Sequence, residues 1–203
     1  MTRPSSAVRT KLFDEPEGKF LHDVILASCH SFGEKTALVD TSYSPPLRLS
    51  YAEFGERVER IARGLVAAGI RPRDVIGIYL PNCWEFAATF HAVTLAGGIP
   101  TLLNPTYRER EVRYQLENSE SVALITDGVM LENIDLGGLS HLRKVFTTRT
   151  PSGRSASLST LYGTGESSSV PRPEHDPRLT LAALPYSSGT TGLPKGVMLS
   201  HRN

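Results

Sequence analysis

The sequence predicts an α/β fold in which a mostly parallel sheet is flanked by helices. Short apolar runs alternate with amphipathic segments along most of the chain, and the links between them are short. The 203 residues are 39% hydrophobic and 21% charged, which is ordinary for a globular domain with a core. Since parallel strands need crossover connections, this order indicates a sheet covered by helices. The expected strands are 36–40, 75–80, 99–103, 122–126, 144–148, 179–184 and 197–199.

The first expected helix follows Ser50. Ser50 and Glu53 have the spacing of a capping box, in which each side chain binds the backbone N–H of the other residue. Apolar residues then recur at intervals of three and four up to Leu65, so they share one helical face. Gly69 stands where a left-handed residue commonly ends a helix.

Two more helices are expected, at 84–96 and 108–118. The first is apolar on most sides, which predicts packing on two faces, and Asn82 with Glu85 provides its start signal. The second has a polar outer face. Residues 149–178 are rich in Ser, Gly and Pro with little periodicity, so we expect a long surface connection there.

Composition excludes several classes of function. A net charge of +1 and an aromatic content of 7% give no case for nucleic-acid binding. No apolar run approaches the roughly 20 residues that span a bilayer, and the N-terminus lacks a secretory signal. Cys29 and Cys83 are far apart, without histidines at ligand spacing. We therefore expect a cytoplasmic protein with two reduced thiols, no metal ligands in this chain, no membrane span and no nucleic-acid partner.

The chemistry-bearing segment is the loop 186–197, which reads YSSGTTGLPKGV. Glycines allow backbone N–H groups to approach an anion without interference from a Cβ atom. Hydroxyl groups donate to phosphate oxygens, and a lysine adds a charge-assisted contact worth roughly 1.5–3 kcal/mol. The pattern differs from the common P-loop, because Leu193 and Pro194 separate Gly192 from Lys195 and a glycine follows the lysine. Composition alone leaves two alternatives: a polyphosphate-binding loop, or a flexible turn between two strands.

The full segment resembles the phosphate-loop signature of the adenylate-forming superfamily, which contains acyl- and aryl-CoA synthetases, luciferases and peptide-synthetase adenylation domains. The resemblance extends over most of the chain. Residues 49–54 look like the start of the family's first helix, and 80–86 fit the acyl-CoA ligase stretch L-P-N-x-x-E-F. Asn104-Pro105 is similar to the ligases of the 4-coumarate–CoA ligase type, whereas peptide-synthetase domains more often have Asp-Pro there.

This resemblance implies that residues 1–203 form the N-terminal portion of an AMP-binding domain, the first part of the large N-terminal domain, with the C-terminal domain absent. It implies two steps: a carboxylic acid reacts with ATP, as its Mg2+ complex, to give an acyl-adenylate, and CoA then displaces AMP. The missing C-terminal part of the same enzyme is an implied partner, no catalytic residue is assigned in this chain, and the chain alone is expected to be inactive. The implied phosphate-binding residues are Ser187, Ser188, Gly189, Thr190, Thr191, Gly192 and Lys195.

Two other functions stay open. One is an adenylation domain that loads a carrier protein instead of CoA, and the other is a truncated, non-catalytic binding protein. A catalytic role for His201, which directly follows the loop segment, is weighed against a structural role at the start of a helix with Ser200 as its N-cap. For His91 and Trp84, packing in the core is the preferred interpretation.

Overall fold

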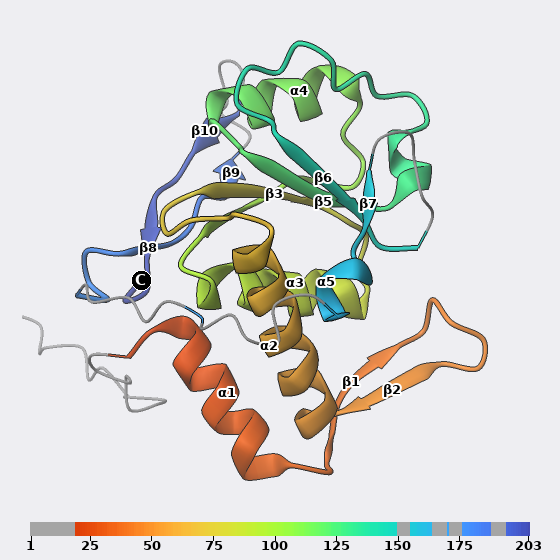
Figure 1. The fold of residues 1–203 in the computed structure, drawn as a ribbon, viewed down its shortest axis with the longest axis vertical. Helices are drawn as coiled ribbons and strands as arrows, with labels where there is room; N and C mark the ends of the chain where they lie inside the picture. Colours follow the sequence, from red (N-terminus) through yellow and green to blue (C-terminus); the bar gives the residue numbers. More distant parts are fainter. Residues whose placement is uncertain (1–18, 150–154, 164–169, 171–175, 188–193) are drawn as a thin grey trace, which may run out of the picture.

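The fold is a five-stranded parallel sheet with helices on both faces (Figure 1). The computed structural model describes residues 19–149, 155–163, 170, 176–187 and 194–203. Within the sheet the strand order is β4-β3-β5-β6-β7, and each neighbouring pair runs parallel. The predicted fold class is therefore confirmed. The strands are β3 (Val75–Tyr79), β4 (Ile99–Leu102), β5 (Ala123–Thr126), β6 (Lys144–Thr147) and β7 (Ala156–Ser157).

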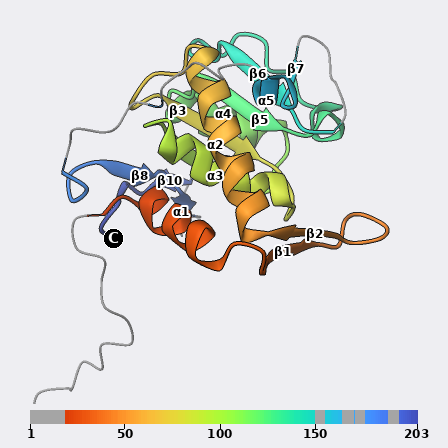
Figure 2. The ribbon, with the colours of Figure 1, turned by 60° about the horizontal axis from the view of Figure 1, so that its bottom comes forward.

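Two separate cores cover the two faces of the sheet. On one face lie α1 (Leu21–Phe32), α2 (Tyr51–Ala67), α3 (Trp84–Leu95) and α5 (Thr160–Gly163), with a core that includes Ile61, Ile76 and Ala88. On the other face lies α4 (Glu109–Asn118), whose Val112 and Leu116 pack on the sheet (Figures 1 and 2). The 3-10 helix η1 (Gly128–Leu131) follows β5.

Gly77 allows α4 to approach β3 closely. A Cβ atom at this position would stand 2.7 Å from Cδ2 of Leu116 and 3.1 Å from Cδ1 of Leu124. Glycine inside a strand often marks such a close approach. Both apolar faces of the sheet are thus buried, as expected for parallel strands.

The predicted start and end of α2 are confirmed. The Ser50 hydroxyl oxygen accepts from the backbone N–H of Glu53 at 3.2 Å, and the Glu53 carboxylate accepts from the N–H of Ser50 at 2.8 Å. Gly69 follows the helix with φ +85°, in the left-handed region that glycine tolerates. The capping box and this glycine therefore fix both ends of α2 from local sequence.

The predicted start of α3 is wrong in its detail. Its N-cap residue is Cys83, which makes no side-chain cap hydrogen bond, and Asn82 is exposed. The capping group is instead the carboxylate of Asp40, whose Oδ2 accepts from the backbone N–H of Trp84 at 2.9 Å. Asp40 ends β1 (Thr36–Asp40), far away in sequence, so the cap arises from tertiary structure. Trp84 is buried in the core, as expected.

The expectation of a surface connection over 149–178 is also partly wrong. Residues from this segment form β7, the fifth strand of the sheet, and α5. Leu158 is 1% exposed and Leu161 is 3% exposed, so both belong to the core. Two leucines give too little periodicity for a sequence signal, yet these two buried side chains anchor the end of a short strand and a single helical turn to the core. The stretches 150–154, 164–169 and 171–175 lie outside the described residues.

Some elements have no counterpart in the sequence predictions. The helix α1 precedes the first predicted strand, and β2 (Leu47–Ser50) pairs antiparallel with β1 to form a hairpin that projects from the helical layer (Figures 1 and 2). Among the helices that the structure describes, none is both long and apolar enough to cross a bilayer.

Candidate functional site

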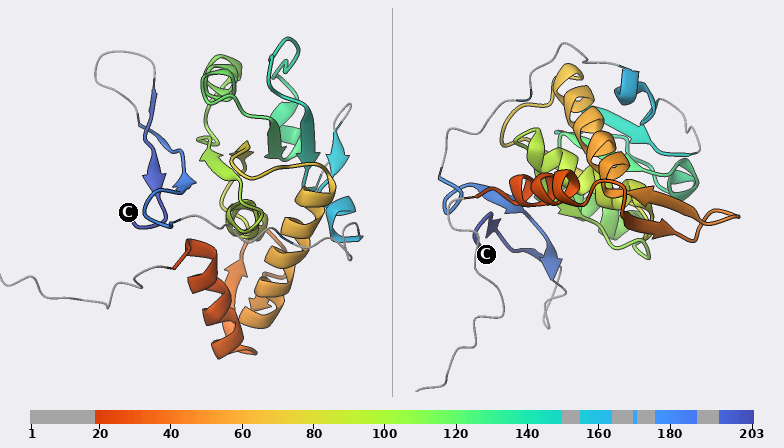
Figure 3. Two further views of the ribbon diagram at one scale, coloured as in Figure 1. Left: turned by 60° about the vertical axis from the view of Figure 1, so that its left-hand side comes forward. Right: turned by 90° about the horizontal axis from the view of Figure 1, so that it is seen from below.

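The described ends of the segment 186–197 form a two-stranded stem at the edge of the main sheet (Figure 3). We use the term loop stem for residues 184–187 and 194–197. Within it, β9 (Tyr186–Ser187) pairs antiparallel with β10 (Lys195–Gly196), and the backbone N–H of Val197 donates to the carbonyl of Pro185 at 2.8 Å. Below the stem, β8 (Leu181–Ala183) pairs with β11 (Leu199–Ser200). The returning strand expected at 197–199 is therefore wrong in its bounds: only Leu199 lies in a strand, β11, and Val197 and Met198 form the link between β10 and β11.

The stem brings two predicted site residues together. Ser187 stands directly opposite Lys195 in the register of β9 and β10, and both residues are exposed. Within the part of the chain that the structure describes, no carboxylate lies within ion-pair distance of the Lys195 ammonium, so no described acidic group competes with an anion for it. The other predicted residues, Ser188, Gly189, Thr190, Thr191 and Gly192, lie outside the described residues.

Tyr186 covers the glycine opposite it. A Cβ atom at position 196 would lie 3.2 Å from Cε2 and 3.3 Å from Cζ of the Tyr186 ring, which is tighter than an ordinary contact. Gly196 therefore lets the aromatic ring cross the ladder, as an aromatic residue opposite a strand glycine often does. The Tyr186 hydroxyl donates to Oδ1 of Asn118 in α4 at 2.6 Å. Burial, with a smaller contribution from Tyr114, raises the pKa of Tyr186, so the hydroxyl keeps the proton that it donates.

A second set of contacts fastens the stem to the edge strand β4. The backbone N–H of Leu184 donates to the carbonyl of Pro100 at 2.9 Å, and the Thr101 hydroxyl donates to the carbonyl of Leu184 at 2.7 Å. The amide of Gln115 in α4 donates to the Thr101 hydroxyl at 2.8 Å. Proline suits an edge strand because it lacks the N–H that an inner strand must pair. The strand that enters the loop is thus held by the sheet and by α4.

Sequence reasoning missed Thr101, Gln115 and Asn118. Thr101 lies 83 residues from Leu184 and Asn118 lies 68 residues from Tyr186, so no local pattern connects them to the loop. The one available signal is Gln115, a polar residue next to the inward-facing Leu116 of a short amphipathic helix. A buried amide of this kind needs hydrogen-bond partners, but the sequence does not say which.

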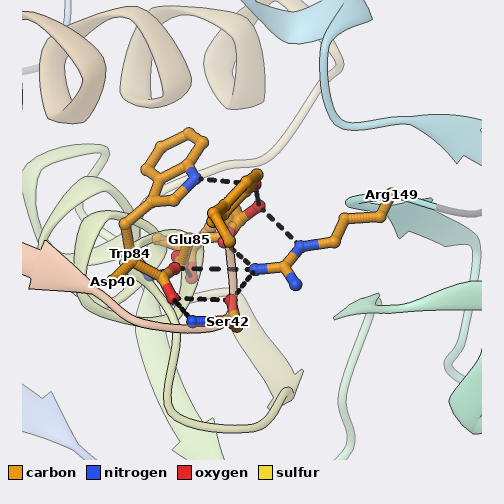
Figure 4. A network of polar contacts seen from close by, with 7 residues as sticks. Asp40, Ser42, Trp84, Glu85 and Arg149 are labelled. Atoms are coloured by element: carbon orange, nitrogen blue, oxygen red, sulfur yellow. Dashed lines mark hydrogen bonds and ion pairs between the residues drawn. The ribbon is translucent and has the colours of Figure 1, made fainter. Parts of the chain in front are cut away.

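A second polar cluster lies where β3 and β6 end, at the carboxyl edge of the sheet (Figure 4). The Arg149 guanidinium donates to both carboxylate oxygens of Glu85, at 3.2 and 3.1 Å, and lies 3.6 Å from Asp40. Ser42 donates to Asp40 through its N–H and its hydroxyl, and the Tyr43 hydroxyl donates to Glu85 at 3.2 Å.

This cluster is a structural network. Burial would raise the pKa of Asp40, but hydrogen bonds from Ser42 and from the Trp84 N–H, together with Arg149, outweigh burial and lower it. Hydrogen bonding to Glu85 raises the pKa of Arg149. Ligands of open α/β sheets usually bind at the carboxyl edge, but here the side chains at that edge are paired with one another. The loop stem is the better candidate for an anion site, because Lys195 forms no ion pair with any carboxylate that the structure describes.

His201 has a structural contact. Its Nδ1 accepts from the backbone N–H of Leu21, the first residue of α1, at 3.1 Å. Its ring meets Phe20 edge to face, with the centroids 4.9 Å apart. Burial, with His22 next, lowers the pKa of His201 to about 4, so at neutral pH the ring is uncharged and can accept this bond. His201 therefore satisfies one of the free N–H groups at the start of α1.

Comparison with known sequences gives the family of the chain. The profile of the AMP-binding enzyme family matches residues 26–203. The chain is 33% identical over 196 residues to 4-coumarate–CoA ligase 1 of Narcissus pseudonarcissus, an alignment that covers 95% of this chain and 35% of the relative. It is also 33% identical over 191 residues to triostin synthetase I of Streptomyces triostinicus, covering 92% and 33%. The chain thus spans about a third of the length of these relatives.

Solved structures agree with the sequence comparison. A long-chain fatty-acid–CoA ligase from Archaeoglobus fulgidus matches with a TM-score of 0.79 and 27% identity, over 93% of this chain and 38% of that one. An anthranilate–CoA ligase bound to anthranoyl-AMP matches with a TM-score of 0.82 over 92% of this chain and 36% of the other, and at 22% identity this likeness concerns the fold. Because the family profile covers most of the sequence, the chain belongs to the AMP-binding enzyme family.

Proposed function

We propose that the chain supplies the phosphate-binding loop of an ATP-dependent acid–thiol ligase. The enzyme activates a carboxylic acid as an acyl-adenylate and transfers the acyl group to CoA. The observation that carries this proposal is the loop stem, which holds Ser187 and Lys195 opposite each other at the two ends of a segment rich in hydroxyl groups and glycine. Family membership supports the reaction class.

The residues of this chain act in the first step. A carboxylate oxygen attacks the α-phosphorus of ATP, the bond from that phosphorus to the bridging oxygen breaks, and pyrophosphate leaves with the bonding electrons. Negative charge grows on the departing pyrophosphate, where the Lys195 ammonium and the hydroxyl groups of residues 187, 188, 190 and 191 stabilise it. Such a reaction depends on position and charge more than on covalent participation by the protein. CoA sulfur then attacks the acyl carbon, and AMP leaves.

ATP enters as its magnesium complex, because the metal neutralises part of the polyphosphate charge. We assign no Mg2+ ligand in this chain. The chain covers about a third of the length of its relatives. The residues of the loop stem are assigned to the phosphates of ATP, and we assign no described residue to the acid or to CoA. We therefore expect the 203 residues alone to be inactive, with the remainder of the enzyme as a required partner. Two free thiols, Cys29 and Cys83, fit the reducing cytoplasm, which is the location we expect.

Loading of a carrier protein is the second candidate, because the loop signature also resembles that of peptide-synthetase adenylation domains. Triostin synthetase I and 4-coumarate–CoA ligase 1 are both 33% identical to the chain, so overall identity does not decide between the two acceptors. The turn at Asn104 does not show whether CoA or a carrier protein accepts the acyl group. Oδ1 of Asn104 accepts from the N–H of Thr106 at 2.9 Å and from its hydroxyl at 2.8 Å, and an aspartate could accept both bonds equally well. The preference for CoA therefore has to be tested with acceptors.

The test is acid-dependent exchange of labelled pyrophosphate into ATP by the complete protein that carries this chain. The acids are 4-coumarate, anthranilate and a long-chain fatty acid, which are taken from the names of the relatives. We expect exchange with at least one acid, none without acid, and none from residues 1–203 alone. Offering CoA and a phosphopantetheinyl carrier protein then identifies the acceptor. A complete protein that binds ATP but exchanges with no acid would favour a non-catalytic binding role.

A further inference from the structure

One face of α4 points toward the loop stem through two separate polar contacts. Gln115 and Asn118 are three residues apart, so they lie on the same side of the helix. Gln115 reaches Thr101, which holds Leu184, and Asn118 receives the hydroxyl of Tyr186. We propose that α4 positions the phosphate-binding loop and that Gln115 and Asn118 are positioning residues. This inference rests on the proposed function, since it concerns the same loop.

The inner contact is a directed chain of hydrogen bonds. The one hydrogen of the Thr101 hydroxyl goes to the carbonyl of Leu184, so this hydroxyl must accept from Gln115. The Gln115 amide nitrogen uses its second hydrogen on the carbonyl of Leu102 at 3.0 Å. Thr101 and Gln115 are both buried, at 0% and 1% exposure. Because both amide hydrogens of Gln115 are used in hydrogen bonds to β4, and Thr101 of β4 binds Leu184, the helix α4, the strand β4 and the loop stem are held together.

The outer contact fixes the residue next to Ser187. The Tyr186 ring lies over Gly196, so it touches both strands of the stem, and its hydroxyl is held by Asn118. Leu184 and Tyr186 are the third residue and the first residue before Ser187. The two contacts therefore fix the position of the stem relative to the sheet and also its rotation about the entering strand.

A fixed stem matters because the loop works by position. Small displacements of groups that bind a reacting phosphate reduce their effect steeply, by as much as about 100-fold for 1 Å. Asn118 is exposed, so loss of its single hydrogen bond to Tyr186 removes little of the fold's stability. A positioning role and a purely structural role thus predict different results for the Asn118–Tyr186 pair.

The experiment measures MgATP binding to the complete protein by titration calorimetry without any acid, so the identity of the acid is not needed. Tyr186→Phe keeps the ring over Gly196 and removes the hydroxyl, and Asn118→Ala removes the acceptor. We expect each change to raise the Kd for MgATP about tenfold, and the double variant to be no weaker than either single one. Asn118→Asp keeps an acceptor oxygen and should bind within about twofold of the unsubstituted protein.

The matched control is Arg110→Ala, an exposed position on α4, which should leave the Kd unchanged. For the inner contact, Thr101→Val should weaken MgATP binding about tenfold, and Thr101→Ser, which keeps the hydroxyl, should restore it. Thermal unfolding of each variant shows that the comparison is made between folded proteins.

Two results would overturn the positioning role while leaving the proposed function intact: normal MgATP affinity in Tyr186→Phe and Asn118→Ala, or losses that simply add in the double variant. Failure of Asn118→Asp to bind better than Asn118→Ala would also count against it. If the unsubstituted protein does not bind MgATP, the proposed function itself fails and the positioning role fails with it.

Discussion

The guanidinium of Arg149 and the carboxylate of Glu85 form a two-point pair, with Nε 3.2 Å from Oε1 and Nη2 3.1 Å from Oε2. Arg149 follows the end of β6, Glu85 lies in the first turn of α3, and Asp40, 3.6 Å from the same guanidinium, ends β1. One cation therefore joins three parts of the chain. The side chains of Glu85 and Asp40 are 5% and 1% exposed, so both depend on this partner.

Arg149→Ala should therefore destabilise the fold. The change leaves two buried carboxylates without their cation, and we expect a loss of about 3 kcal/mol in the free energy of unfolding, the low end for a broken buried pair because Arg149 itself is partly exposed. Arg149→Lys should lose less, since an ammonium keeps the charge but cannot form both bonds. Urea unfolding followed by the fluorescence of Trp84, the single tryptophan, gives the measurement.

The control is Arg143→Ala. Arg143 is 57% exposed and pairs with Asp74 at 3.5 Å, an exposed contact worth about 0–1 kcal/mol. A loss for Arg149→Ala no larger than that for Arg143→Ala would show that the network contributes nothing special to stability.

Gly64→Ala should also destabilise the fold, although alanine is normally the better helix former. A Cβ atom at position 64 would stand 2.4 Å from the carbonyl oxygen and 2.5 Å from Cβ of Leu161, so α2 and α5 would have to separate. Overpacking of this kind costs about 1–3 kcal/mol. The neighbouring Arg63→Ala, at a position that forms one surface ion pair, should stay within about 0.5 kcal/mol. Equal midpoints of urea unfolding for Gly64→Ala and the unsubstituted chain would contradict the close contact between α2 and α5.

Local signals predicted the parts of the fold that local chemistry decides. The capping box of Ser50 and Glu53, the left-handed Gly69 and the apolar strands of the parallel sheet are all readable within a few residues. The family signature likewise drew attention to the segment 186–197. The structure places Ser187 opposite Lys195 at the base of this segment, and their binding of phosphate stays a prediction.

Contacts between distant residues decide the parts that were not predicted. The cap of α3 comes from Asp40, 44 residues from Trp84, so Asn82 gave a misleading signal. The segment 149–178 looked like a connection because Leu158 and Leu161 are its only signs of helical spacing. The close contact that buries Leu161 depends on Gly64 of α2, which lies far earlier in the chain. Asn118 and Thr101 reach the loop stem through the folded chain. Contacts between residues so far apart along the chain leave no periodic pattern in the sequence.

Stability should fall in mild acid because His201 must stay neutral to accept from Leu21. Burial lowers the pKa of His201 in the fold to about 4, from an unfolded value of 6.5. A base with a lowered folded pKa stabilises the fold fully above pH 6.5, and this contribution is lost as the pH falls from 6.5 toward 4, because the unfolded chain binds the proton first. The midpoint of urea unfolding should drop over that window.

His201→Asn should reduce the slope of the unfolding free energy against pH. The reduction corresponds to at most about one proton in the number that the chain takes up on unfolding. His30→Asn, at an exposed position of α1, is the matched control and should leave the dependence unchanged. If the stability of His201→Asn and of the unsubstituted chain depended on pH in the same way, protonation of His201 would not be what weakens the fold in this range.

The central claim is that the loop on the stem of Ser187 and Lys195 holds the phosphates of ATP, and calorimetric titration of the complete protein with MgATP tests it most directly. Lys195→Ala removes a charge-assisted contact worth roughly 1.5–3 kcal/mol, so the Kd should rise at least about tenfold. Lys144→Ala, on an exposed position of β6, should not change it. Equal MgATP affinities for Lys195→Ala, Lys144→Ala and the unsubstituted protein would contradict the claim.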